Sequence, residues 1–241
     1  MELKTTERRA SYSSPAILAR RQRILDFTRV LISERGYANF NLGELGARAG
    51  VAKQTIYNIF GTKERLIATA INDYFEEREK RIHYTSAPAT MERMIERMIV
   101  AGRASQSIPH YMAALMAIHH ALDTDPDIWE AIHRVSTYPH RAWIKRLAEK
   151  GDLQPWVDAP TLIDELAAHS NLVLLEWCRG KIDGDGSLSR RVIGSLSIMA
   201  GATRGSARQE IEARLAQIAD QGLPSYPEPE PSESAERPSV R

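Results

Sequence analysis

The stretch GVAKQTIYNIFGTKERL, residues 50–66, places polar and apolar side chains on opposite faces of one short helix. Ile56 and Phe60 stand one turn apart and can pack inward, together with Val51 from the preceding turn. Three polar residues occupy positions i, i+3 and i+4 and share the outward face: Gln54, Tyr57 and Asn58. The helix is predicted from about Lys53 to Phe60. Because a glycine turn precedes it, the stretch predicts the second half of a helix-turn-helix.

The residues before this stretch complete the motif. Asn41 followed by Glu44 resembles a capping box, which predicts a short helix over residues 42–49 that Gly50 ends. A longer amphipathic helix is predicted over residues 16–35, where apolar positions recur at helical spacing. The three helices together predict a small domain in which the first two brace the third.

The polar residue types of this region suit the major groove of DNA. Gln and Asn pair with adenine through two hydrogen bonds, Thr contacts a base or a thymine methyl group, and Lys and Tyr reach phosphates. The N-terminus of the next helix, at Thr62 and Lys63, can bind a phosphate through its free N–H groups. The alternative is a solvated surface, and Tyr57 could instead pack half-buried against a neighbouring helix. The candidate DNA-binding residues are Asn41, Lys53, Gln54, Thr55, Tyr57, Asn58, Thr62 and Lys63.

A set of residues here resembles the DNA-binding domain of the tetracycline-repressor (TetR) family: Gly36-Tyr37, Leu45, Ala49-Gly50-Val51, Thr55-Ile56-Tyr57, Phe60, Thr62-Lys63-Glu64 and Leu66. The resemblance covers about residues 17–71. It implies an all-helical homodimer with a small DNA-binding domain and a larger C-terminal domain that binds a small effector and dimerises. It further implies that the helix from Lys63 to about His83 links the two domains. In the family, effector binding changes the separation of the recognition helices and usually releases the operator.

Some positions depart from the family pattern. Ala52 stands where the family commonly has a Ser or Thr that caps the recognition helix, a loss of about 1 kcal/mol. Asn41 replaces a usual Thr, but it can still cap the helix and donate to a phosphate. Gly43 and Gly46 lie inside the helix over residues 42–49 and each cost about 1 kcal/mol relative to Ala, so we expect a slightly looser helix.

The rest of the chain predicts further helices and no sustained strand pattern, so the expected fold class is all-α. Helices are expected over residues 63–83, 90–107, 108–122, 127–150, 160–180 and 187–221, the last with a possible break at Gly205, and Asp183-Gly-Asp-Gly is expected to form a turn. The expected domains are a flexible basic arm (1–15), the helix-turn-helix domain (16–62), an effector-binding and dimerisation domain (63–221) and a disordered tail rich in Pro, Glu and Ser (222–241).

The net charge of +1 conceals an uneven distribution. Residues 1–65 contain 12 Lys and Arg against 6 Asp and Glu, which favours contact with a polyanion, although a solvated basic face gives the same count. The single cysteine, Cys178, excludes an intrachain disulfide and a cysteine-based metal cluster within one chain. No apolar run is long enough for a membrane span, and we expect a cytoplasmic protein with no membrane partner.

Motifs of catalysis and metal binding are missing from the sequence. It contains no Walker A loop, GxGxxG, HExxH or GxSxG, so we expect neither an enzyme nor a cofactor. His133 and His140 are seven residues apart on one predicted helix, which is too far for a single metal site unless other helices contribute. We therefore expect no metal.

The C-terminal helices supply candidates for two further tasks. The first set could line an adaptable apolar effector pocket, with ordinary core packing as the alternative for each member: Met94, Met98, Tyr111, Met112, Met116, His119, Trp143 and Trp177. The second set forms stripes that could pair two subunits as a four-helix bundle or could face the core of their own subunit: Leu162, Leu166, Val173, Val192, Leu196 and Met199.

The sequence thus predicts a ligand-responsive transcriptional regulator, most simply a repressor, that binds a palindromic operator as a homodimer. A small, largely apolar effector is expected to release it. The alternative from a different class is a DNA-associated or structural dimer with no effector, in which the C-terminal helices only dimerise.

Overall fold

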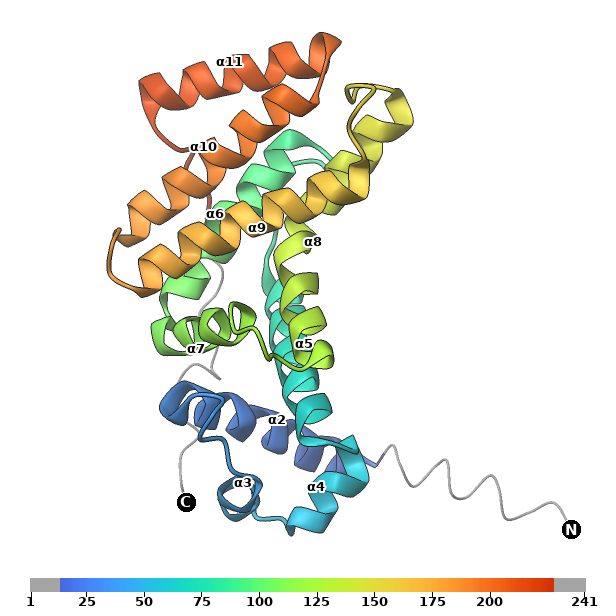
Figure 1. The fold of residues 1–241 in the computed structure, drawn as a ribbon, viewed down its shortest axis with the longest axis vertical. Helices are drawn as coiled ribbons and strands as arrows, with labels where there is room; N and C mark the ends of the chain where they lie inside the picture. The colour runs from blue at the N-terminus through green and yellow to red at the C-terminus, as the bar shows by residue number, and fades with distance from the viewer. Residues whose placement is uncertain (1–13, 228–241) are drawn as a thin grey trace, which may run out of the picture.

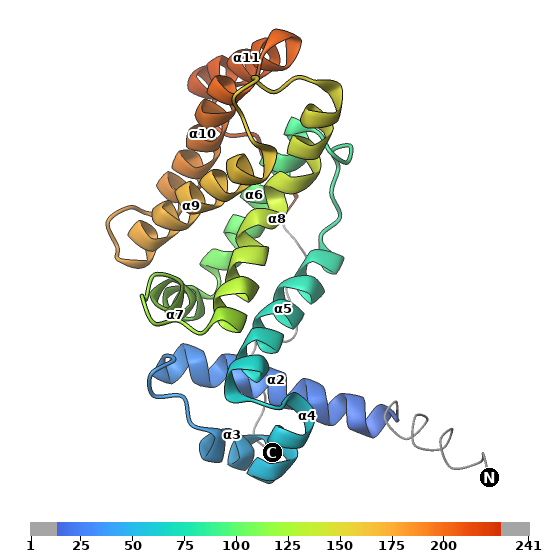
Figure 2. The ribbon, with the colours of Figure 1, turned by 45° about the vertical axis from the view of Figure 1, so that its right-hand side comes forward.

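The computed structural model describes residues 14–227, which form ten helices and no strand, as the all-α prediction requires. A single isolated antiparallel bridge joins Leu153 to Thr203. Figures 1 and 2 show a small unit of three helices at one end and a larger helical unit above it. The helices are α2 (Pro15–Arg35), α3 (Leu42–Ala49), α4 (Lys53–Phe60), α5 (Lys63–Arg81), α6 (Met91–Gln106), α7 (Pro109–His119), α8 (Pro126–Lys150), α9 (Ala159–Cys178), α10 (Gly184–Ala202) and α11 (Gly205–Gln221).

The small unit consists of α2, α3 and α4, whose bounds agree with the predicted helices. Ile24, Leu45 and Ile56, one from each helix, are buried in a common core. The inward residues predicted from the 3.6-residue period therefore do meet. Leu66, Ile67 and Ile71 from the start of α5 belong to the same core, so the unit is closed by the fourth helix.

Helix α5 rises out of the small unit into the larger one (Figure 1). Thr62 caps its first turn by accepting a hydrogen bond from the Arg65 N–H at 3.1 Å. The Arg65 guanidinium lies 3.6 Å from the Asp127 carboxylate at the start of α8. Helix α5 thus contacts both units and is the segment of chain that connects them.

The larger unit contains a second core, made by α6, α8, α9, α10 and α11. Its members include Ile99, Ile144, Leu166 and Leu196, all fully buried. In Figure 1, α9 and α10 cross over α6, and α11 lies above them. Residues 63–221 were expected to fold together, but α7 and the start of α8 pack into the first core with the small unit.

Two predictions about the C-terminal part were wrong. Asp183-Gly-Asp-Gly was expected to be a turn, whereas α10 already begins at Gly184, because the Asp183 carboxylate accepts the Gly186 N–H at 2.7 Å and caps the helix. The disordered tail was expected from residue 222, yet Leu223 and Tyr226 pack against the second core. Residues 1–13 of the predicted arm and residues 228–241 of the tail lie outside the described residues.

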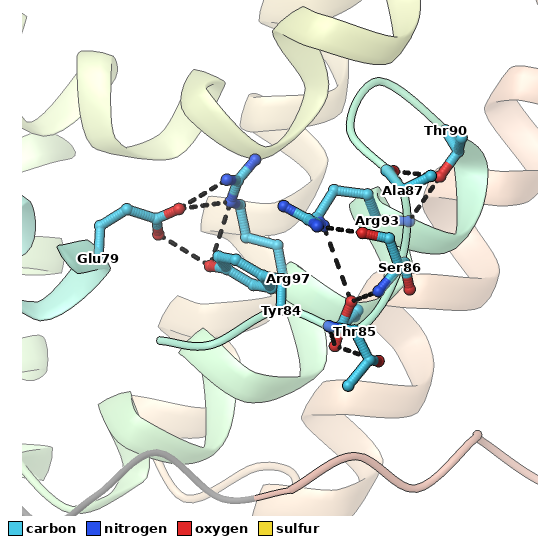
Figure 3. Close-up of polar contacts among 9 residues, drawn as sticks. Glu79, Tyr84, Thr85, Ser86, Ala87, Thr90, Arg93 and Arg97 are labelled. Carbon is cyan, nitrogen blue, oxygen red and sulfur yellow. Dashed lines mark hydrogen bonds and ion pairs between the residues drawn. The ribbon is translucent and has the colours of Figure 1, made fainter. Parts of the chain in front are cut away.

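A network of polar contacts ties the end of α5 to α6 (Figure 3). Arg97 donates two hydrogen bonds to the Glu79 carboxylate, at 2.9 and 2.6 Å, and its Nε also lies 3.2 Å from the Tyr84 hydroxyl. Glu96, only 1% exposed, accepts hydrogen bonds from the backbone N–H groups of Thr85 and Ser86 at 2.7 and 2.8 Å. These contacts fix the segment that follows α5 against the second core.

Replacing Glu96 with alanine is expected to lower the free energy of unfolding by about 2 kcal/mol at neutral pH, because two N–H groups lose their charged acceptor. Burial raises the pKa of Glu96, but hydrogen bonds from Thr85 and Ser86 outweigh it and hold the pKa below its usual value. The contribution is therefore complete above the unfolded pKa of about 4.3 and is lost as the pH falls through the lower folded pKa.

Urea unfolding at several pH values measures this effect, with Glu76→Ala, an exposed position on α5, as the control. The difference between wild type and Glu96→Ala should be present at pH 7 and should shrink below pH 5. A difference that is unchanged by acid would contradict the role of the ionised carboxylate.

Candidate nucleic-acid interface

The turn between α3 and α4 is tighter than the sequence alone indicated. Gly50 adopts a left-handed conformation with φ of 65°, and the Val51 N–H donates to the Gly46 carbonyl at 2.9 Å. A Cβ atom on Gly46 would lie 2.7 Å from the Val51 carbonyl oxygen. The glycine inside α3 is therefore needed for the close approach of the turn, in addition to the helix-propensity cost that we expected from it.

Helix α3 is anchored to α2 at its C-terminal end. Arg23 of α2 donates its Nε to the Ala49 carbonyl at 2.9 Å, which satisfies an acceptor at the C-terminus of α3. Arg48 lies 2.9 Å from Glu34 of α2 and 2.7 Å from Glu44 of its own helix. These contacts hold α3 as a rigid support for the helix that follows it.

Helix α4 presents the predicted polar face to solvent. Lys53, Gln54, Tyr57 and Asn58 are exposed, while Thr55 is partly covered. Gln54 donates its Nε2 to the Asn58 Oδ1 at 3.0 Å. This contact does not use the Gln54 carbonyl oxygen or the Asn58 amide nitrogen. One is an acceptor and the other a donor, and an adenine edge requires one of each.

The remaining candidate residues lie at helix starts or beside aromatic rings. Asn41 caps α3 by accepting from the N–H groups of Gly43 and Glu44, at 2.6 and 3.2 Å. Ala52 provides no side-chain cap for α4, as we expected from its residue type. The Lys63 ammonium lies 4.8 Å from the centre of the Tyr37 ring, and its side chain is partly covered. Asn41, Thr62 and Lys63 therefore border the helix-turn-helix, and only the α4 residues form its outward face.

The effector candidates do not line one common pocket. Met94, Met98 and Trp143 are buried in the second core. Tyr111, Met112 and Met116 of α7 are buried in the first core, which also contains the helix-turn-helix. Trp177 packs against that first core, and His119 stacks on Trp129 at a ring distance of 5.9 Å. As a set, these residues are divided between two cores, and most of them serve packing.

The predicted dimer stripes are also internal. All six candidates are buried within the single subunit: Leu162, Leu166, Val173, Val192, Leu196 and Met199. They follow the alternative that the stripes face their own core, so the expected interface residues need correction. Beside these buried stripes, Leu172 of α9 is 54% exposed and Ile193 of α10 is 39% exposed. Their periodicity alone could not show which apolar face points outward.

The histidines form ring stacks and hydrogen bonds in this structure. The His133 ring stacks on Trp129 at 4.6 Å, and its Nε2 lies 3.2 Å from the Asp164 carboxylate. Burial first, and then the neighbouring His120 and His133, lower the pKa of His119 to about 4, so its imidazole is neutral at pH 7. Among residues 14–227, no three His, Cys, Asp or Glu side chains are placed to hold a metal ion. In the same part of the chain, every helix is too short or too polar to cross a membrane.

Comparisons with known proteins agree with the geometry of the N-terminal unit. Residues 24–70 match the family described as "Bacterial regulatory proteins, tetR family". The chain is 28% identical over 152 residues to the HTH-type transcriptional repressor KstR of Rhodococcus jostii, covering 63% of this chain and 64% of KstR. It is 25% identical over 145 residues to the uncharacterised HTH-type regulator YezE of Bacillus subtilis, covering 58% of this chain and 75% of YezE. The match spans less than two thirds of the length of KstR.

Solved structures of regulators share the fold at low identity. A TetR transcriptional regulator from a Rhodococcus species has a TM-score of 0.55 at 20% identity, over 75% of this chain and 95% of that one. The full-length regulator TylP of Streptomyces fradiae has a TM-score of 0.58 at 17% identity, over 88% of this chain and all of TylP. The likeness extends through the C-terminal helices, which the matched family segment does not cover.

Proposed function

We propose that this chain, a transcriptional regulator of the TetR family, represses transcription as a homodimer on a palindromic operator and is released by a small effector. The observation that carries the proposal is the exposed Gln54–Asn58 pair on α4, held by a braced helix-turn-helix. That arrangement suits the reading of base edges, because its side chains are fixed to one another before DNA arrives. The relative named a repressor, KstR, supports the direction of regulation.

A dimer is proposed because the C-terminal helices leave apolar residues uncovered. Leu172 and Ile193 border the contact between α9 and α10, where the His169 Nε2 lies 3.2 Å from the Arg190 carbonyl oxygen. Exposed apolar side chains on two packed helices are typical of a surface that pairs with a second copy. A twofold dimer places two recognition helices in a fixed relation and calls for a palindromic operator.

Effector response is proposed through contacts that join the two units. The Arg29 guanidinium of α2 lies 4.6 Å from the Tyr74 ring centre on α5, and that ring lies 5.8 Å from the Tyr111 ring on α7. A displacement of α7 would therefore change the contacts of α2. Packed contacts of this kind transmit discrete movements between sites.

Selection of bound sequences from random duplex DNA, at one fixed salt concentration, tests the proposed function. A palindromic motif with two equal half-sites is the expected result. Absence of any enriched sequence would mean that the exposed face of α4 does not read bases, and the protein would then be a structural dimer.

Substitutions on α4 and at the start of α5 refine that test. Gln54→Ala or Asn58→Ala should each weaken binding to the selected operator by about 1 to 3 kcal/mol and relax the base preference at one position per half-site. Lys63→Ala should weaken operator and random DNA alike and lower the salt dependence, because a phosphate contact carries no base information. Equal losses on both DNAs for all three variants would contradict the assignment.

A further inference from the structure

Two guanidinium groups from different helices meet one face of α6 inside the larger unit. Arg78 of α5 donates its Nη1 to the Ser105 hydroxyl at 3.2 Å. Arg191 of α10 reaches the same helix, and its Nη1 lies 3.3 Å from the point that a Cβ on Gly102 would occupy. Gly102 and Ser105 are three residues apart on α6, so the two cations lie on the same face, about one turn apart.

Neither cation has a carboxylate partner among residues 14–227. The acidic groups nearest in sequence to this face are already paired, because Glu79 binds Arg97 and Glu96 binds Arg93. Arg78 packs its guanidinium 4.5 Å from the Phe75 ring centre. The Arg191 Nε is buried with no hydrogen-bond partner. An unpaired cation in such a place is costly, because it has lost water without gaining an anion.

The charge of Arg78 also acts on Arg191. Burial, and after it the charge of Arg78, lowers the pKa of Arg191 to about 10. Burial likewise lowers the pKa of Arg78. Both effects oppose the charged forms of two cations that contact the same face of α6. An anion bound between them would remove the repulsion and restore the ordinary preference for charge.

Two buried hydroxyls elsewhere in the larger unit also lack hydrogen-bond partners among the described residues. The Ser195 hydroxyl, one turn beyond Arg191 on α10, is buried and makes no hydrogen bond within the described residues. The Ser170 hydroxyl on α9 is in the same state. His140 of α8 is buried, and its Nδ1 contacts only the Met94 sulfur, at 3.5 Å. These hydroxyls are donors that the packing of the subunit leaves unused, and an oxyanion could accept from them.

We propose that Arg78 and Arg191 bind the anionic group, a carboxylate or a phosphate, of the effector. The inference rests on the proposed function and narrows its effector from an apolar molecule to one with an anionic end. Two partly buried like charges destabilise the empty protein, which is the usual cost of a site built for a ligand. Guanidinium groups suit this task, because their planar donors match the oxygens of carboxylates and phosphates.

The position of Arg78 on α5 allows anion binding to affect the DNA-binding unit. Arg78 belongs to α5, which begins at Lys63 beside the helix-turn-helix. Arg191 belongs to α10, which lies in the larger unit. An anion held by both would draw α5 toward α6 and α10, so the differential contact required for a shift between two states lies on the linking helix.

Thermal melting of the full chain tests the site without DNA. The probes are sodium octanoate and inorganic phosphate, each compared with sodium chloride at equal ionic strength, and octanamide serves as the neutral match for octanoate. One of the two anions should raise the Tm by about 3 °C or more at saturation, and octanamide should not. The arm that responds identifies the group as a carboxylate or a phosphate. Equal melting temperatures in all four solutions would overturn the proposal.

The variants Arg191→Met and Arg78→Met separate a binding role from a structural one, with Arg179→Met, an exposed arginine at the end of α9, as the matched control. Without anion, Arg191→Met should melt at or above the wild-type temperature, because a buried unpaired charge is gone, and the anion-dependent shift should vanish. Arg78→Met should lose the same shift, and Arg179→Met should keep it. An Arg191→Met protein that melts well below wild type, with the shift intact, would overturn the proposal.

A chain that ends at Pro227 lacks four glutamates of the C-terminal segment and tests an internal source of the anion. If only the shortened chain gains stability from octanoate or phosphate, those glutamates occupy the site and the effector assignment fails. The melting shift and the selection of operator DNA are independent results. An enriched palindrome without an anion-dependent shift in Tm would contradict only the proposed anionic effector. A shift in Tm without an enriched DNA sequence would contradict the proposed function.

Discussion

Gly46→Ala is expected to abolish operator binding, with a loss of at least about 100-fold in affinity, although alanine is the better helix former. The new Cβ would lie 2.7 Å from the Val51 carbonyl oxygen and 3.7 Å from the Lys53 amide nitrogen. Both neighbours are backbone atoms of the turn, so α4 has to move for the methyl group to fit. Overpacking of this kind costs about 1 to 3 kcal/mol, which exceeds the gain of about 1 kcal/mol in helix propensity.

The loss in binding should be larger than the loss in stability, because base contacts depend on the placement of α4 to within about 0.5 Å. Fluorescence anisotropy with the selected operator and thermal melting of the same samples measure the two effects. Gly43→Ala is the control in the same helix, since its Cβ would meet only the Asn41 side-chain oxygen, at 3.0 Å. Retained operator affinity in Gly46→Ala would show that the turn is not the element that positions α4.

The same glycine marks the limit of inference from the sequence. Residue spacing predicted α3, the turn and α4 with their observed bounds, because helical periodicity and caps are local properties. From the same sequence, Gly46 could only be counted as a cost to α3. Its reason lies in a contact with a carbonyl five residues later, and such contacts follow from the three-dimensional turn rather than from composition.

The C-terminal helices show a different limit. Leu166 and Leu172 are both apolar and lie on one helix, but the first is fully buried and the second is exposed. Periodicity identifies an apolar stripe, and it does not say which of two stripes meets the core. The methionines of α6 and α7 posed the same difficulty, and they turned out to be divided between two cores.

The partly buried, unpaired arginines could not be found from the sequence at all. Arg78 lies in the charged run EEREKR, which is typical of a solvated helix face, and Arg191 follows another arginine. Their burial is a tertiary property, produced where α5, α6 and α10 meet. A cation that the core encloses without an acid is visible only in the folded chain.

The double substitution Leu172→Glu and Ile193→Glu is expected to convert the proposed dimer to monomers and to weaken operator binding by about 100-fold or more. The two side chains are 54% and 39% exposed in the single subunit, and their neighbours on the surface are small, with Ala168, Ser197 and Gly201 also exposed. Small residues beside larger apolar ones allow two helices to approach closely. Glutamates placed opposite their symmetry mates would lose water and repel one another.

The change should leave the fold of each subunit intact, because exposed positions contribute little to its core. Sedimentation equilibrium measures the dimer constant, and circular dichroism verifies the helical content. Leu122→Glu is the matched control, since Leu122 is a fully exposed leucine, 106% accessible, far from α9 and α10 in the sequence. The control should remain a dimer and should bind the operator as wild type does.

Operator binding by the double variant gives the sharper result, because a palindrome rewards two linked recognition helices. Two monomers must each lose the entropy of association to fill the palindrome, whereas a dimer loses it once. The affinity for the full operator should therefore fall toward the affinity for one half-site. The substitutions should leave the half-site affinity unchanged. Loss on the palindrome with an unchanged half-site would place the dimer contact at Leu172 and Ile193. If the double variant sediments as a dimer and binds the palindrome as tightly as wild type, the subunits pair through another face. Leu172 and Ile193 would then have no role in dimerisation.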